Sequence, residues 1–225
     1  MSETAGDLVV AIDGPSGSGK STSARAVAGA LGLEVLDTGA MYRAVTLTAL
    51  EAGVALDDEI ACAALARKHA ISVDNGITTI DGRDVSAEIR GPEVTAAVSA
   101  VSAHPEVRAV LVAHQRSWVS DHGAGVVEGR DIGTVVFPAA RLKVFLTASD
   151  DERARRRQLD EEASARAVDV DDVRSAMVKR DALDSGRAVS PLRPADDAIE
   201  IDTTGRGVDD VVAELVQRAR GVGIG

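Results

Sequence analysis

The feature that most constrains the fold of this 225-residue chain is the octapeptide GPSGSGKS, from Gly14 to Ser21. A short apolar run, LVVAI, precedes it at residues 8–12, and apolar residues at helical spacing follow it from Ala24 to Leu31. An apolar run that ends at Asp-Gly-Pro is typical of a buried strand in a parallel sheet. The octapeptide therefore predicts a glycine-rich loop between a strand and a helix, and its spacing fits the pattern G-x-x-x-x-G-K-[ST].

Each residue type in this loop suits the binding of a phosphate chain. The glycines allow positive φ, so that backbone N–H groups turn inward around phosphate oxygens, and the following helix directs the positive end of its dipole at them. Lys20 can neutralise the terminal phosphates, and the Ser21 hydroxyl can hold Mg²⁺. A structural turn needs no such set of constraints, so we predict a site for ATP here. Its residues are Gly14, Pro15, Ser16, Gly17, Ser18, Gly19, Lys20, Ser21 and Thr22.

Further along the chain, short apolar runs alternate with stretches of helical periodicity. This alternation is typical of an α/β protein whose parallel sheet is covered by helices on both faces. Aromatic residues make up only 2% of the chain, so its core must consist of alanine, valine, leucine and isoleucine. We predict a five-stranded parallel sheet of the P-loop NTPase type, with strands at residues 8–12, 34–37, 126–128, 141–149 and 198–204.

Residues 40–95 do not follow the alternation of single strands and helices seen in the rest of the chain. Two helices are predicted there, the second capped by Asp57 and ending near Lys68. The segment ISVDNGITTI then alternates around Asn75-Gly76, a favoured pair for a hairpin turn. A small hairpin amid helices indicates an insertion beside the main sheet.

Residues 150–187 are densely charged and poor in apolar side chains, as expected of a helical lid. Ser149 and Glu152 have the spacing of a capping box at the start of its first helix. The predicted organisation is a core domain of residues 1–39, 96–150 and 188–225, an insertion at 40–95, and a lid with its flanking helices at 151–187.

Composition and charge exclude several classes of protein. The formal net charge is −11, which argues against a surface that binds nucleic-acid polymers. Cys62 is the only cysteine, so an internal disulfide is ruled out, and the four histidines lack metal-ligand spacing. No apolar run reaches the length of a membrane span, about 20 residues, and the N-terminus lacks the features of a secretory signal. We therefore expect a cytoplasmic protein that binds neither nucleic-acid polymers nor membranes.

The phosphate loop alone does not show which class of triphosphate-binding protein this is. A regulatory GTPase needs an N-K-x-D segment that reads guanine, and the sequence has none. A motor or transport ATPase usually has an apolar run that ends in Asp or Asp-Glu, whereas the nearest run here, GVVEGRD, ends in a Gly-Arg-Asp turn. The rest of the chain instead indicates a place for a second, small, anionic substrate.

Arginines lie where the phosphate of such a substrate would bind. Arg43 lies one turn into the helix after the second strand, and Arg130 follows a strand at the edge where open parallel sheets bind ligands. Arg180, Asp184 and Arg187 recur at spacings of four and three, so they share a helix face. The alternative is a set of surface ion pairs, which add little stability. Several arginines at strand ends beside a phosphate loop favour the binding site.

Three further segments carry a resemblance to a known family. DTGAMYR at 37–43, GRDIGTVVFP at 129–138 and the pattern RDxxDSxR at 180–187 follow the loop in order. Together they resemble the bacterial cytidylate kinases of the nucleoside monophosphate kinase superfamily, and the resemblance extends from Leu8 to about Leu215. It implies a core with an inserted NMP-binding subdomain and a short helical lid. It also implies a monomeric enzyme that transfers the γ-phosphate of Mg²⁺-ATP to CMP or dCMP.

The resemblance implies roles for residues at matching motif positions. The CMP phosphate would be held by Thr38, Arg43, Arg130 and Arg187, with Asp37 beside them. The cytosine edge would be read by Ser99, Arg108 and Asp131, and the ribose hydroxyls by Arg180 and Asp184. In the lid, Arg153, Arg156 and Arg157 would close over the triphosphate, whereas Arg155 is expected to face elsewhere. The catalytic residues would be Lys20, Arg130, Arg157 and Arg187, with Ser21 as the metal ligand.

Two alternatives stay open at this point. One is the same type of reaction with another acceptor, such as UMP, AMP or a small hydroxylated acid. The other is a sensor that binds ATP without turning it over. Intact Lys20 and Ser21 and the full set of arginines count against the sensor, because a sensor needs no site for an acceptor phosphate.

Overall fold

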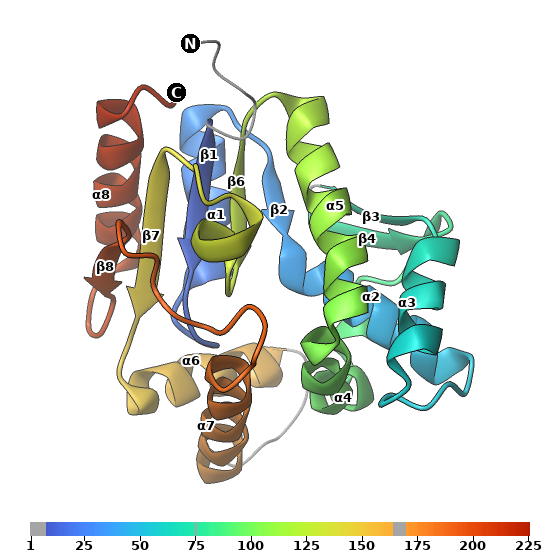
Figure 1. Ribbon diagram of the computed structural model, residues 1–225. Helices are drawn as coiled ribbons and strands as arrows, with labels where there is room; N and C mark the ends of the chain where they lie inside the picture. The colour runs from blue at the N-terminus through green and yellow to red at the C-terminus, as the bar shows by residue number, and fades with distance from the viewer. Residues whose placement is uncertain (1–7, 75, 164–169) are drawn as a thin grey trace.

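The computed structural model describes residues 8–74, 76–163 and 170–225 (Figure 1). Its main sheet has five parallel strands, as predicted. Their order across the sheet is β2 (Val35–Asp37), β6 (Gly125–Gly129), β1 (Val9–Asp13), β7 (Leu142–Thr147) and β8 (Ile199–Asp202). The register pairs Asp13 with Gly129 and Asp37 with Glu128, so three acidic side chains come to the carboxyl edge of the sheet.

Helices cover both faces of this sheet. Val10 and Ile12 of β1 pack with α1 (Lys20–Leu31) and α8 (Val208–Gly221) on one face. Val9 and Ala11 belong to the core on the other face, with α2 (Thr38–Glu51), α4 (Pro92–Ala103) and α5 (Pro105–His122). A strand buried on both faces has no polar positions to alternate with, which explains its continuous apolar run.

Much of the predicted insertion at residues 40–95 forms a small unit beside the sheet. It contains α3 (Glu59–Lys68), the strands β3 (Ile71–Asp74), β4 (Ile77–Ile80) and β5 (Arg83–Asp84), and the 3₁₀ turn η2 (Glu88–Arg90). The predicted hairpin is confirmed by antiparallel pairing of β3 with β4, although Asn75 at its turn lies outside the described residues. The predicted cap is wrong by one residue, since Asp58 and not Asp57 accepts from the Ala61 N–H at 2.9 Å.

Helices α6 (Asp150–Ala163) and α7 (Val170–Ser185) pack on each other at the end of the sheet to which the strands point (Figure 1). Half of the predicted capping box is present, because the Glu152 N–H donates to Ser149 Oγ at 3.3 Å. Instead of returning the bond to Ser149, the Glu152 carboxylate accepts from Arg155 and Arg156. Guanidinium partners hold a carboxylate more strongly than an amide does.

Three short elements were not predicted from the sequence: β5, η2 and a turn after β6. A π-helical turn, η3 (Ile132–Val136), follows β6 and begins directly after Arg130 and Asp131. Within the described residues, no helix combines the length and the apolar character that a membrane crossing requires.

Candidate active site

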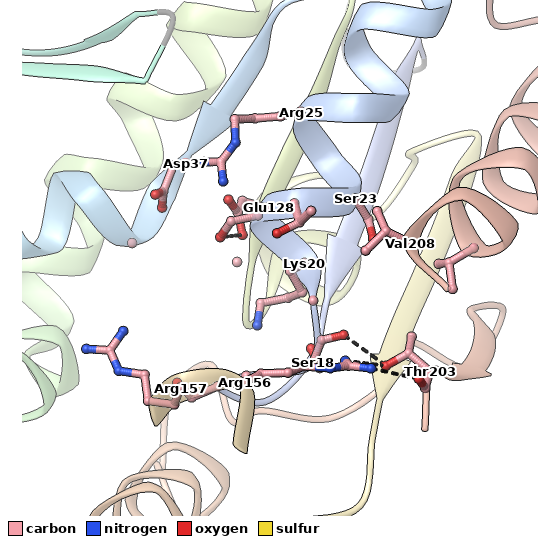
Figure 2. A pocket seen from close by; sticks show the side chains of 18 of the residues that line it. Ser18, Lys20, Ser23, Arg25, Asp37, Glu128, Arg156, Arg157, Thr203 and Val208 are labelled. Atoms are coloured by element: carbon pink, nitrogen blue, oxygen red, sulfur yellow. Dashed lines mark hydrogen bonds between the residues drawn. The ribbon is translucent and has the colours of Figure 1, made fainter. Parts of the chain in front are cut away.

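A cavity of about 780 Å³ opens at the carboxyl edge of the sheet. The loop between β1 and α1 forms one wall, and residues of β6, α2, α6, α7 and α8 form the others. Figure 2 shows Lys20, Glu128 and Asp37 around one part of this space and Arg157 reaching toward it from α6. The cavity therefore joins the predicted triphosphate loop to several of the predicted arginines.

The glycines of the loop have the backbone conformation that the motif predicts. Gly14, Gly17 and Gly19 have φ values of +147°, +75° and +88°. A Cβ on Gly14 would lie 2.1 Å from the Leu146 carbonyl oxygen, so a larger residue does not fit there. Close packing and positive φ together fix glycine at this position.

Lys20 and Ser21 begin α1 at the cavity wall. Lys20 is 7% exposed, and its Nζ donates to the Pro15 carbonyl at 2.6 Å. Burial and the charge of Arg130 lower the pKa of the Lys20 ammonium. Ser21 Oγ donates to Glu128 Oε2 at 2.8 Å. The Lys20 ammonium is thus poorly solvated, and an anionic ligand would stabilise its charged form.

Glu128 is a site residue that the sequence analysis missed. It is 4% exposed at the end of β6, and burial, with the Asp37 carboxylate nearby, raises its pKa. The signal was present, because a lone acid inside the apolar run GVVEG has no structural reason to be there. Among the described residues, no group of three or more His, Cys, Asp or Glu is arranged to hold a metal. Glu128, Asp37 and the Ser21 hydroxyl nevertheless offer the hard oxygen atoms that suit Mg²⁺.

Arginines gather at another wall of the cavity. Arg43 Nη1 donates to the Ile89 carbonyl at 3.1 Å and to Thr95 Oγ1 at 2.9 Å. Burial and the charge of Arg157 lower the pKa of Arg43 to about 10, and burial and Arg130 lower that of Arg180 to about 9. Cations that lower one another's pKa form a site whose charge an anion would balance.

Next to this cluster lies a buried ionic network that reaches the cavity through Arg130. Arg108 and Asp131 form an ion pair with side chains 4% and 5% exposed. Asp184 pairs with Arg187 and accepts from Arg130 Nε at 3.1 Å. The structure thus brings five of the predicted acceptor residues together, and of these Arg130 lines the cavity.

The Arg108–Asp131 pair includes a buried polar atom without a partner among the described residues. Arg108 stacks over the Tyr42 ring, with its Cζ 5.2 Å from the centroid. Arg108 Nε is buried and has no hydrogen-bond partner within the part of the chain that the structure describes. Buried polar atoms normally have partners, so this region is suited to a polar ligand.

The remaining predicted residues have varied positions. Thr38 Oγ1 donates to the Glu128 carbonyl at 2.7 Å and lies behind the cavity wall. Ser99 is half-buried on α4 and also lies outside the lining. Asp37 lines the cavity and caps α2 by accepting from the Ala40 N–H at 3.0 Å.

The arginines of α6 that line the cavity are not the set expected from the sequence. Arg156 and Arg157 line the cavity, and Arg156 Nη1 donates to Thr203 Oγ1 at 2.9 Å (Figure 2). Arg155, which was expected to face elsewhere, also lines it. Arg153, which was expected to join them, lies outside the lining, because its guanidinium is bonded to Asp150, to Asp181 and to the Ser16 carbonyl.

Asp13 is a second missed residue. It ends β1, is 4% exposed, and accepts from the Ile132 and Gly133 N–H groups at 2.8 Å each. These bonds hold the start of η3 and so the Arg130-Asp131 turn before it. Burial raises the pKa of Asp13 to about 6.

Asp13→Asn is expected to change how stability depends on pH. The folded-state pKa of Asp13, about 6, lies above the ordinary 3.8, so the folded protein retains a proton that the unfolded chain has released. Through Asp13, the free energy of unfolding falls by up to about 3 kcal/mol as pH rises from about 4 to about 6. Urea denaturation should show the wild type losing stability relative to Asp13→Asn over this interval. A constant difference between the two proteins would contradict the assignment.

Comparisons with known proteins agree with this geometry. The sequence model of the family described as cytidylate kinase matches residues 10–221. The cytidylate kinase of Corynebacterium efficiens is 53% identical over 216 residues, 94% of each chain, and that of Nocardia farcinica is 53% identical over 212 residues, 92% of this chain and 91% of its own. The cytidylate kinase of Caldanaerobacter subterraneus subsp. tengcongensis is 47% identical over 211 residues, 94% of each chain.

A solved structure is similar in fold. It is an uncharacterized protein from Eubacterium ventriosum, with a TM-score of 0.53 and 12% identity, and the match covers 95% of this chain and 98% of the other. At that identity the similarity supports the α/β architecture and nothing further.

Proposed function

The chain belongs to the cytidylate kinase family, and we propose that it transfers the γ-phosphate of ATP to CMP and dCMP. Besides family membership, one structural observation supports this proposal. A triphosphate-type loop and a cluster of arginines face the same cavity. Such a cavity suits two phosphate-bearing substrates held end to end.

The reaction needs positioning and charge neutralisation more than proton transfer. The CMP phosphate has a second pKa of about 6, so near neutral pH its oxygen is already a nucleophile. That oxygen forms a bond to the γ-phosphorus while the bond from this phosphorus to the bridging oxygen of ADP breaks. Two polyanions must approach for this in-line step, and Lys20 with the arginine cluster offsets their repulsion.

Different acceptor residues are proposed to bind the phosphate, the base and the ribose of CMP. Arg43, Arg130 and Arg187 would bind the phosphate with paired N–H donors, and Thr38 would assist them. Asp131, Arg108 and Ser99 would read the base, and Arg180 and Asp184 would hold the ribose. Uracil presents a carbonyl where cytosine presents an amine, so the Asp131 carboxylate would disfavour it.

The donor residues are proposed to enclose ATP. The loop of residues 14–22 would surround its phosphates with backbone N–H groups, apart from Pro15, which has none, and Ser16, whose N–H donates to Asp181. Arg156 and Arg157 would close over the phosphates and exclude water. Mg²⁺ would be held at the Ser21 hydroxyl near Glu128 and Asp37, and when bound it supplies positive charge to the β- and γ-phosphate oxygens.

The cellular setting is proposed from the same reasoning. We expect a cytoplasmic monomer whose partners are ATP, CMP and dCMP. The net charge of −11 supports the expectation that it binds no nucleic-acid polymer. Light scattering of the purified protein tests the monomer.

One assay tests the function against its alternatives. The purified protein is incubated with Mg²⁺-ATP and, separately, with CMP, dCMP, UMP, AMP or a small hydroxylated acid, and ADP release is measured. CMP and dCMP are expected to give the highest kcat/KM. Faster turnover with another acceptor would replace the proposed substrate. Bound ATP without any acceptor-dependent ADP release would identify a sensor.

A further inference from the structure

Two helices at the lid side hold the triphosphate loop by the peptide groups of Ser16. The Ser16 N–H donates to Asp181 Oδ1 at 3.3 Å, and the Ser16 carbonyl accepts from Arg153 Nη1 at 2.9 Å. Arg153 and Asp181 also form an ion pair with each other. We name Asp181, Arg153 and the peptide groups of Ser16 the loop clasp.

The loop clasp is shielded from water. The side chain of Asp181 is 14% exposed and that of Arg153 is 7% exposed. Next to the clasp, a Cβ on Gly17 would lie 2.8 Å from the Arg153 carbonyl oxygen and 2.8 Å from Met177 Cε. The loop therefore packs directly on α6 and α7. Hydrogen bonds between charged groups gain strength where water is excluded, so the clasp fixes this part of the loop.

The helix that carries Asp181 also holds the acceptor side of the cavity. Arg180, its neighbour, lines the cavity. Asp184, three residues further on, is 1% exposed, pairs with Arg187 and accepts from Arg130 Nε at 3.1 Å. Residues three apart on a helix are neighbours on one face. One turn of α7 thus bonds to the donor loop through Asp181 and to the acceptor arginines through Asp184.

We propose that Asp181 is a positioning residue that couples the triphosphate loop to the acceptor arginines through α7. The inference rests on the proposed kinase function. Asp181 acts through Ser16 and α7 and needs no contact with either substrate. When a triphosphate orders the loop, the hydrogen bonds of the loop clasp form in one geometry and fix the position of α7. Arg180 and Asp184 on α7 are then placed where CMP binds. Bound ATP then tightens CMP binding, and CMP tightens ATP binding by the same factor.

The test is the effect of one ligand on the affinity for the other. Calorimetry measures the Kd of CMP with and without AMP-PNP, a non-hydrolysable ATP analogue, in Mg²⁺ buffer. In the wild type, AMP-PNP is expected to lower the Kd of CMP about fivefold or more. In Asp181→Asn this effect is expected to disappear, and the Kd of AMP-PNP is expected to rise about tenfold, as for the loss of a charged hydrogen bond. Asp181→Glu, which keeps the carboxylate, should recover part of the effect.

A matched control removes an exposed carboxylate in the same way. Asp196 pairs with Arg193 at 3.5 Å, and its side chain is 100% exposed. Asp196→Asn should leave both Kd values and their coupling as in the wild type. If Asp181→Asn does not fold, the double variant Arg153→Gln with Asp181→Asn removes both charges of the ion pair, and it is expected to lose the coupling as well.

Two results would overturn the inference. One is a wild type in which AMP-PNP leaves the Kd of CMP unchanged. The other is a folded Asp181→Asn that retains the full effect, which would reduce Asp181 to a structural contact. Failure of the proposed function is a separate result, because a protein that binds both ligands and gives no CMP-dependent ADP release can still show the coupling.

Discussion

A Lys20→Met variant is expected to fold and to bind CMP, yet to have a kcat lower than the wild type by about 10²- to 10³-fold. Methionine preserves most of the apolar stem of lysine and removes the ammonium. In the wild type the Lys20 ammonium is buried at the cavity wall, where a charge acts on a developing phosphate charge with little screening. Loss of one such preorganised group typically costs this factor in kcat. Steady-state measurement of ADP release over a range of CMP and ATP concentrations gives the value.

The matched control is Lys68→Met, which removes an exposed lysine from α3. It should have the kcat and KM of the wild type. A Lys20→Met enzyme with the kcat of this control would show that the Lys20 charge does not act in the transition state. A rise in KM for ATP with kcat preserved would assign Lys20 to ground-state binding alone.

The second large effect is expected in the choice of base. Asp131→Asn should lower the ratio of kcat/KM for CMP to kcat/KM for UMP by about tenfold or more. A carboxylate only accepts hydrogen bonds, whereas an amide also donates, so the amide in this variant satisfies the uracil carbonyl as well as the cytosine amine. A correct base contact of this kind is worth about 1–3 kcal/mol.

This ratio is robust to loss of stability. Asp131 neutralises the buried Arg108, and removal of one partner of a buried pair typically costs about 3–5 kcal/mol of stability. Both substrates are turned over by the same folded fraction, so the ratio is unaffected by how much enzyme is folded. Asp196→Asn again serves as the control, and an unchanged ratio in Asp131→Asn would remove this residue from base reading.

Local signals in the sequence were enough for most of the elements and for the backbone conformation of the phosphate loop. Gly14, Gly17 and Gly19 adopt the positive φ that the motif requires, and the continuous apolar run before them is a strand buried on both faces. The hairpin follows in the same way from the alternation around Gly76. Such signals are reliable because the conformation depends on residues that adjoin one another in the chain.

Asp13 and the partners of Arg153 could not be found in this way, and the lone acid in GVVEG marks Glu128 without telling which residues it meets. Glu128 and Asp13 lie at the ends of apolar runs, and only the strand register brings them to the cavity edge and under the Arg130-Asp131 turn. Arg153 belongs to a cluster of arginines that the sequence cannot distinguish from one another. Its contact with the Ser16 carbonyl spans 137 residues of chain, so the packing of α6 and α7 on the loop decided which arginine is buried.

By itself, therefore, the sequence determined the parallel α/β fold, the phosphate loop and the family, because these depend on short-range backbone preferences and on motifs. Only the tertiary structure decided which charges face the cavity and which neutralise one another. Arg130 meets Asp184 across 54 residues of chain, and Arg108 meets Asp131 between a helix and a turn. The energy of a charge depends on its burial and on the distance to its partners, and neither quantity exists until the chain is folded.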